Sequence, residues 1–250
     1  MVITKFAYLK FLSLRGVECT GVEYCYTGDL NTKRKDAMKQ LLFEAFGTFF
    51  VALTVMVSGG ENPLAVGLMI AALMYVGRAI SGAHLNPAIS LTLYATGRLG
   101  LDRLGWYVVS QLVGAFIAAL FYFWIFSQAY LPGIIMNVGI ETAMIMEALL
   151  TMVVCLVVFV NAQEREVFHG ATMVGIAFCA TLFIGGSLNP AVAGAALLSG
   201  AVFRHPSLFL GKELLGHILV YICGPLLGAL CAAAAHRYFN KPQEQQTYRA

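Results

Sequence analysis

The sequence predicts an all-α membrane protein in which six transmembrane helices and two half-helices form an inverted repeat. Three observations predict this fold class. Hydrophobic residues make up 59% of the 250 residues and charged residues only 12%, about half the charged fraction of a soluble domain. The apolar segments are long enough to cross a bilayer. One short motif also occurs at matched positions in two apolar halves. The net charge of +3 gives no reason to expect a nucleic-acid partner.

The repeat is defined by two motifs and two acidic residues. The stretch Leu85-Asn86-Pro87-Ala88 recurs 103 residues later as Leu188-Asn189-Pro190-Ala191. Glu44 and Glu147 are separated by the same 103 residues, and each stands 42 residues before its Asn. Matched segments in two apolar halves are typical of membrane proteins built from internal structural repeats.

Each Asn-Pro-Ala motif predicts the start of a short helix. Asn is a favoured N-cap residue, and Pro is favoured at the first helical position, where its missing N–H costs nothing. About ten residues follow before Gly97 in the first copy and Gly200 in the second, too few to cross a hydrocarbon core of about 30 Å. We therefore predict half-helices at about 87–96 and 190–199.

The remaining apolar segments predict the transmembrane helices. The six expected spans are about 40–58, 64–82, 104–126, 140–161, 170–184 and 214–236. Each repeat, about 40–126 and 140–236, contains three spans, and because three is odd the second repeat enters the membrane from the opposite side. The two half-helices then meet Asn to Asn near the membrane midplane.

The charge distribution predicts the orientation. We expect a cytoplasmic N-terminal tail at 1–37, a membrane domain at 38–240 and a C-terminal tail at 241–250. With both termini cytoplasmic, 14 of the 16 Lys and Arg residues lie inside, and only Arg204 and Lys212 lie outside. This bias is the one that the positive-inside rule expects.

The chemistry of the chain predicts hydrogen bonding rather than catalysis. A phosphate-binding glycine loop, a metal-ligand cluster and a nucleophile motif are all lacking in the sequence, so we expect no enzyme activity, cofactor or metal. Two helix N-termini at mid-membrane place partial positive charge there, and the amides of Asn86 and Asn189 add N–H donors. Such a centre repels cations and protons but binds the oxygen of a neutral molecule.

The segments before each Asn predict a wet path. Gly82-Ala83-His84 and Gly185-Gly186-Ser187 must enter the membrane as non-helical backbone, which is tolerated only where it lines a water-filled cavity or is buried in protein. The predicted path is therefore a row of carbonyl acceptors with a donor pair at its centre.

Three titratable residues have two interpretations each. Glu44 and Glu147 could carry protons or ions, since an acid within the membrane is a functional hypothesis. Alternatively, each accepts backbone N–H bonds from the irregular segment of its own half, and the fixed distance before each cap favours this structural role. His84 could act as a gate or pH sensor, or its ring could be packed while its carbonyl lines the path.

On these residues the chain resembles the aquaporin, or major intrinsic protein, family over about residues 38–240. The signals are Glu44 with Gly47-Thr48, the segment 81–88, Gln111 with Gly114-Ala115, Glu147, Asn189-Pro190-Ala191, and Gly224-Pro225 with Gly228-Ala229. The resemblance implies a homotetramer surrounded by membrane lipid, with one pore per subunit and passive flow of water or small neutral solutes. It leaves open whether the membrane is the plasma membrane or that of an organelle.

The chain departs from the family pattern at the outer filter. Family members usually carry Arg directly after the second Asn-Pro-Ala, where this chain has Val192, and glycerol-conducting members often have Asp where it has Ala193. Aligned on the family, the filter positions are Val66, Leu182, Gly186 and Val192. The stretch before Asn189 is about five residues short in this alignment, and Gly186 replaces a frequent cysteine, which implies weak inhibition by mercurials.

Three functions are therefore compatible with the sequence. The first is a passive channel for water, with small uncharged solutes such as glycerol, urea or ammonia as a variant, that excludes protons and ions. The second is a secondary transporter that uses Glu44 and Glu147 for coupling. The third is a channel-inactive scaffold within the membrane, suggested by the shortened loop and the missing Arg.

Overall fold

The computed structural model describes residues 30–131, 138–162, 166–203 and 212–239. The chain divides into two compact units, residues 1–39 and residues 40–250. The described part of the first unit is the beginning of a helix, in which Lys39 Nζ lies 3.4 Å from the carboxylate of Asp36. The predicted C-terminal tail, most of the predicted N-terminal tail, and Arg204 with its loop lie outside the described residues.

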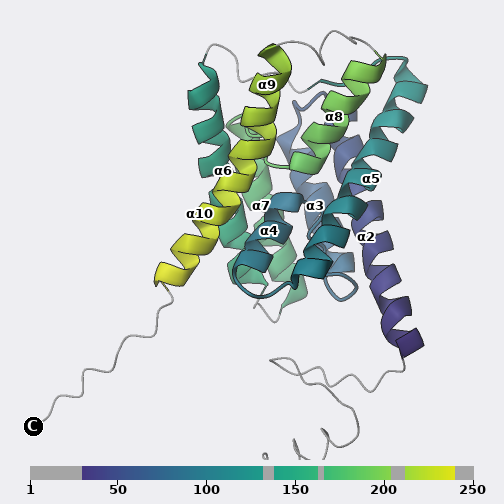
Figure 1. Cartoon of the computed structure of the whole chain (residues 1–250), viewed down its shortest axis with the longest axis vertical. Helices are drawn as coiled ribbons and strands as arrows, with labels where there is room; N and C mark the ends of the chain where they lie inside the picture. Colours follow the sequence, from purple (N-terminus) through teal and green to yellow (C-terminus); the bar gives the residue numbers. More distant parts are fainter. Residues whose placement is uncertain (1–29, 132–137, 163–165, 204–211, 240–250) are drawn as a thin grey trace, which may run out of the picture. The chain divides into compact units, whose positions relative to one another are not determined.

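All regular secondary structure in the described residues is helical, in agreement with the predicted fold class (Figure 1). The long helices are α2 (Leu30–Val57), α5 (Leu101–Phe126), α6 (Ile140–Asn161) and the last span, which joins α9 (Lys212–Ile218), the π-helical segment η2 (Leu219–Cys223) and α10 (Gly224–Phe239). The shorter helices are α3 (Pro63–Gly77), α4 (Pro87–Ala95), α7 (Val167–Phe183) and α8 (Pro190–Phe203). In Figure 1, α8 occupies the upper half of the view and α4 the lower half.

The observed helices correct two of the predicted boundaries and the form of the last predicted span. Among the described residues, four helices are long and apolar enough to cross a membrane by themselves, whereas α3 has 15 residues and α7 has 17, fewer than the roughly 20 that a span needs. The predicted span 64–82 is too long because α3 ends at Gly77, where a Cβ would overlap the ring of Phe43. The predicted half-helix 190–199 is too short, because Gly200 continues α8 and packs beside Leu131. The predicted span 214–236 was expected to be a single helix but contains the π-helical segment.

Corresponding helices of the two halves pack against each other through glycine. At the contact between α3 and α7, a Cβ on Gly67 would lie 2.5 Å from the carbonyl oxygen of Gly175, and a Cβ on Gly175 would lie 2.6 Å from that of Gly67. Real Cβ atoms do not approach backbone oxygen this closely, so both positions exclude any side chain. The two backbones can therefore approach each other as in other small-residue helix contacts in membranes.

A second pair of close contacts repeats within each half. Gly114 of α5 faces the carbonyl of Ala45 on α2, and Gly228 of α10 faces the carbonyl of Ala148 on α6. Ala45 and Ala148 are again 103 residues apart. In addition, α5 packs against α8, and α10 packs against α4. Each short helix is therefore covered by a long helix of the other half.

The outward-facing side chains are mostly apolar. Leu68, Trp106, Trp124 and Phe183 are all more than half exposed. A surface of this kind is a liability in water but is the ordinary lipid-facing surface of an integral membrane protein.

We expect Gly114→Val to destabilise the protein by roughly 1–3 kcal/mol, because its side chain would overlap the carbonyl of Ala45. The measurement is the thermal unfolding midpoint of the purified protein in detergent. Gly105→Ala on the same helix is the matched control, since a Cβ at Gly105 meets no atom within 4 Å. Equal stability of the two variants would contradict the close approach of α5 and α2.

Candidate functional site

The two short helices begin at their Asn residues, and each Asn uses its side-chain oxygen as a cap. Asn86 has extended backbone, and its Oδ1 accepts a hydrogen bond from the N–H of Ala88 at 2.8 Å. Asn189 Oδ1 accepts the equivalent bond from Ala191 at 3.1 Å. Pro87 and Pro190 occupy the first helical positions, where a missing N–H costs nothing. The capping bond leaves the amide nitrogen of each Asn available for other contacts.

The amide nitrogens connect the two halves reciprocally. Asn86 Nδ2 donates to the carbonyl of Leu188 at 2.9 Å, and Asn189 Nδ2 donates to the carbonyl of Leu85 at 2.9 Å. Both Asn side chains line a central cavity of about 10 Å³, which is about the space of one water molecule. An amide nitrogen carries two hydrogens, so each Asn retains one N–H beyond the bond to the opposite carbonyl.

The backbone before each Asn has positive φ at two matched positions in both halves. Gly82 and Gly185 have φ of +90° and +111°, and Leu85 and Leu188 have φ of +52° and +62°. Both pairs are 103 residues apart. A positive φ costs a residue with a side chain roughly 1–3 kcal/mol and persists only where surrounding contacts hold it. The sequence contained no signal for this conformation at Leu.

Two buried carboxylates supply those contacts. Glu44 accepts the N–H groups of His84 at 2.9 Å and Leu85 at 2.7 Å. Glu147 accepts the N–H groups of Ser187 at 2.6 Å and Leu188 at 3.0 Å. Neither carboxylate is exposed to solvent. Each Glu therefore binds the irregular segment of its own half.

The first half contains additional donors that the second half lacks. Glu44 also accepts hydrogen bonds from Ser81 Oγ at 2.7 Å and Gln111 Nε2 at 2.8 Å. The position 103 residues after Ser81 is Ile184, which has no side-chain donor. In the sequence, Gln111 supports the family resemblance, but nothing there predicts that it belongs to the site. Its distance of 67 residues from Glu44 gave no local signal.

His84 lies between the central cavity and a vestibule of about 210 Å³. The vestibule is lined by Met74, Arg78, Gly82, His84, Leu93, Val158, Asn161, Ala162, Gly170 and Ala171. His84 and Met74 also line the central cavity, so they form the boundary between the two spaces. The imidazole is packed edge-on against Tyr107, with ring centroids 5.0 Å apart. No motif in the sequence predicts a role for Arg78, whose Nη2 donates to the carbonyl of Ala162 at 3.3 Å.

The structure places the other predicted site residues differently. Gly82, Ala83 and His84 line one or both of these two cavities, whereas Gly185, Gly186 and Ser187 line neither. Of the predicted filter residues, Val66, Gly186 and Val192 are buried and Leu182 is half-buried at the end of α7. A Cβ at Gly186 would meet the side chains of Leu188 and Leu150. None of the four filter positions lines the central cavity or the vestibule, so the filter remains a prediction.

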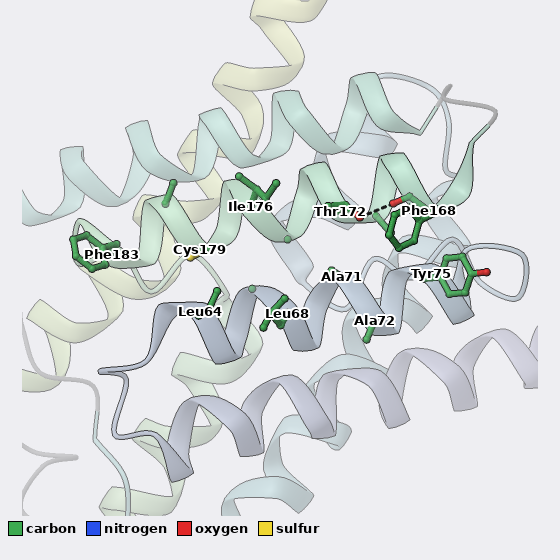
Figure 2. Close-up of a pocket in the computed structure, with 14 residues that line it drawn as sticks. Leu64, Leu68, Ala71, Ala72, Tyr75, Phe168, Thr172, Ile176, Cys179 and Phe183 are labelled. Atoms are coloured by element: carbon green, nitrogen blue, oxygen red, sulfur yellow. Dashed lines mark hydrogen bonds between the residues drawn. The ribbon is translucent and has the colours of Figure 1, made fainter.

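A third cavity of about 890 Å³ is a groove between α3 and α7 (Figure 2). Neither Asn86 nor Asn189 lines it. Its lining is apolar except for a few polar atoms. The hydroxyl of Thr172 donates to the carbonyl of Phe168 at 2.7 Å and is thereby satisfied within its own helix. The rings of Tyr75 and Phe168 pack edge to face across one end. The groove therefore offers no polar path.

Residues 31–236 match the family described as major intrinsic protein. The chain is 29% identical over 221 residues to glycerol uptake facilitator protein-like 6 of Lactiplantibacillus plantarum, which covers 80% of this chain and 97% of that protein. It is 31% identical over 215 residues to an aquaglyceroporin of Toxoplasma gondii, with 78% of this chain and 80% of that protein covered.

The fold is similar to that of a solved channel. The X-ray structure of the aquaglyceroporin from Plasmodium falciparum superposes with a TM-score of 0.65 at 21% identity, and the match covers 80% of this chain and 95% of that one. At this identity the likeness concerns the fold alone.

We expect Glu44→Gln to destabilise the protein about twice as much as Glu147→Gln. Each carboxylate oxygen of Glu44 accepts two hydrogen bonds, so replacing either oxygen by an NH₂ group leaves two donors without an acceptor. Each carboxylate oxygen of Glu147 accepts one, so the same change leaves one donor without an acceptor. Each buried donor left unpaired costs about 1–3 kcal/mol. Unfolding midpoints in detergent measure the difference, and Glu141→Gln, exposed in the first turn of α6, is the control. Equal losses at Glu44 and Glu147 would show that the extra donors add no stability.

Proposed function

This chain belongs to the major intrinsic protein family, and on that premise we propose that it conducts water passively and excludes protons and ions. As a member of the family it is an integral membrane channel for water or small solutes and is not an enzyme. The proposal concerns what passes and what is rejected. It rests on one observation, the reciprocal hydrogen bonds from the amide of each Asn to the carbonyl of the Leu that precedes the other Asn.

The Asn pair supports proton exclusion because it presents donors from two sides. Each Nδ2 is held by the carbonyl of the opposite half, so its second N–H has a fixed direction. The N-termini of α4 and α8 add partial positive charge at the same place. A water molecule at this point accepts hydrogen bonds from the amides, and its lone pairs are then unavailable to a proton from a neighbouring water. Cations are repelled by the same donors and dipoles.

The rest of the proposed path consists of backbone carbonyls. We assign Gly82, Ala83 and His84 to one side of the Asn pair, and Gly185, Gly186 and Ser187 to the other. Carbonyl oxygens can replace the hydrogen bonds that a neutral solute leaves behind in water. The vestibule beside Gly82 and His84 supports the first assignment.

Small uncharged solutes are the proposed variant of this function. The filter assigned by alignment, Val66, Leu182, Gly186 and Val192, contains no charge, so it presents no electrostatic barrier of its own. The names of two relatives, a glycerol uptake facilitator and an aquaglyceroporin, support glycerol as the first solute to test. Urea and ammonia are comparable in polarity and smaller.

The two alternatives receive unequal support. Coupled transport through Glu44 and Glu147 is disfavoured because both carboxylates are fully buried, bound to backbone N–H groups and absent from the lining of the two cavities. A channel-inactive scaffold is favoured by one observation, the small volume of the central cavity, about 10 Å³. A swelling assay separates this alternative from a channel, because a scaffold gives no water flux.

We also propose a homotetramer with both termini in the cytoplasm, in a plasma membrane or an organelle membrane. The apolar groove between α3 and α7 supports the assembly, because its walls offer contact area to another subunit or to lipid. The charge bias of the sequence supports the orientation.

We expect Asn86→Asp to reduce water permeability about tenfold and to raise the proton leak. An Asp at this position keeps the capping oxygen but cannot donate to Leu188, and loss of a hydrogen bond of about 1.4 kcal/mol corresponds to a factor of ten. Stopped-flow swelling of proteoliposomes measures water flux, and an enclosed pH dye measures proton flux. The matched control is Asn62→Asp. Asn62 also caps a helix, α3, by accepting a hydrogen bond from the N–H of Ala65 at 3.0 Å, but it is exposed and lines neither the central cavity nor the vestibule. Equal water and proton flux in the two variants would refute the proposal.

We expect Val192→Arg to reduce glycerol flux about tenfold or more and to reduce water flux less. A long charged side chain would narrow the proposed filter, and glycerol, the larger solute, would have to displace water from the guanidinium group in order to pass. The same proteoliposomes measure both fluxes under glycerol and sucrose gradients. Size-exclusion chromatography verifies that the variant is folded. If neither flux changes, Val192 does not belong to the filter.

A further inference from the structure

A chain of hydrogen bonds connects Glu44 to the ring of His84 through two other side chains. Gln111 Nε2 lies 2.8 Å from Glu44 Oε2 and 3.0 Å from Ser90 Oγ. Ser90 Oγ lies 3.0 Å from His84 Nδ1. Glu44, Ser90 and Gln111 are fully buried, and His84 is 8% exposed. Each of these side chains is therefore restricted to the partners that the structure gives it.

Counting hydrogens along the chain determines which ring nitrogen carries the proton. The atom of Gln111 that faces the carboxylate must be its nitrogen, since an oxygen there would face another acceptor. The second hydrogen of that nitrogen is directed to Ser90 Oγ, which therefore accepts. The hydroxyl hydrogen of Ser90 then donates to His84 Nδ1. With the proton on Nδ1 instead, that hydroxyl hydrogen would be buried without an acceptor among the described residues, which is unfavourable.

The other ring nitrogen, Nε2, faces the vestibule. It has no hydrogen-bond partner among the described residues. Two side-chain atoms there, Gln111 Oε1 and Thr151 Oγ1, are both fully buried and without a partner. Nε2 is not one of these two, so it is not fully buried. A Cβ on Gly82 would lie 3.2 Å from Nε2, and Gly82 lines the vestibule together with His84. The Nε2–H group is therefore accessible at the boundary between the vestibule and the central cavity.

The second half of the repeat shows that folding does not require this chain of bonds. Glu147 binds the backbone of Ser187 and Leu188 as Glu44 binds its own segment. However, the positions 103 residues after His84 and Ser90 are Ser187 and Ala193. When Gly114 is aligned with Gly228, the position that corresponds to Gln111 is Pro225. The bonds to the backbone are common to both halves, whereas the bonds to the ring occur in one half only.

We infer that Ser90 and Gln111 are positioning residues that hold His84 as an Nε2–H donor toward the solute at the narrow boundary of the central cavity. A donor at this point selects molecules that present an accepting oxygen, which are water and small hydroxyl or carbonyl compounds. The selection of solutes rests on the proposed channel function, but the position of the proton on the ring does not. The two can therefore be tested separately.

The first experiment measures the tautomer of His84 in the full chain reconstituted in lipid. The protein is labelled with ¹⁵N-histidine, and the signal of His84 among the five histidines is identified by its loss in His84→Gln. We expect the Nε2–H form to exceed the Nδ1–H form at least about tenfold in the native sequence. In Ser90→Ala the ratio falls to within about threefold of unity, because Nδ1 loses its donor, and Ser90→Thr restores it.

The matched control is Ser199→Ala. Ser199 is also buried in a half-helix, α8, but its hydroxyl donates to the carbonyl of Ala196 at 3.0 Å, so the ratio is expected to stay at the native value. Gln111→Leu provides a second test, because Ser90 Oγ then loses the donor that orients it, its hydroxyl hydrogen is no longer directed at Nδ1, and the ratio should fall. A native protein with the proton on Nδ1, or a Ser90→Ala protein with the native ratio, overturns the inference.

The second experiment measures water permeability in the same variants. We expect Ser90→Ala to change it about two- to tenfold, the effect of one altered hydrogen bond, and Ser199→Ala to leave it unchanged. A change in tautomer without a change in permeability overturns the selective role. Absence of water flux in every variant, with the tautomers as expected, refutes the proposed channel function and supports the positioning of His84.

Discussion

The structure depends on two carboxylates that bind backbone N–H groups inside the membrane. The segments before each Asn leave the helix, so their N–H groups need acceptors where no bulk water is present, and each unsatisfied group would cost several kcal/mol. Glu44 and Glu147 accept two such groups each. These bonds also hold Leu85 and Leu188 at positive φ, which turns the chain so that each Asn can begin a helix pointing away from the other.

Small residues make room for this arrangement. The half-helices can meet only if the longer helices around them pack closely, and Gly67 with Gly175, Gly114 and Gly228 provide backbone contacts that no side chain would permit. Thr92 of α4 also donates to the carbonyl of Ala229 on α10 at 3.2 Å, which fixes a short helix of one half to a long helix of the other. The carboxylates set the path of the backbone, and glycine sets the distance between helices.

The two halves share this framework but differ in what surrounds it. Thr48 donates to the carbonyl of Glu44, whereas Thr151, 103 residues later, has no hydrogen-bond partner for its hydroxyl among the described residues. Ser81 and Gln111 likewise occur in the first half only. The side chains that donate to the buried carboxylate are therefore found on the half that holds His84. The repeat acts as an internal comparison that separates what folding requires from what one half has in addition.

The sequence by itself determined the features that depend on local chemistry and on the repeat. The caps at Asn86 and Asn189, the span at 140–161 and the distance from each Glu to its Asn are all written in short patterns. The tertiary structure decided the rest, because contacts between distant residues set it. Gly77 at the end of α3 lies against the ring of Phe43, and Gly200 within α8 lies against Leu131. The bonds from each Asn amide to the Leu carbonyl of the opposite half, and the bond from Gln111 to Glu44, join residues 67 to 104 positions apart. At such a separation no pattern along the chain specifies which atoms meet.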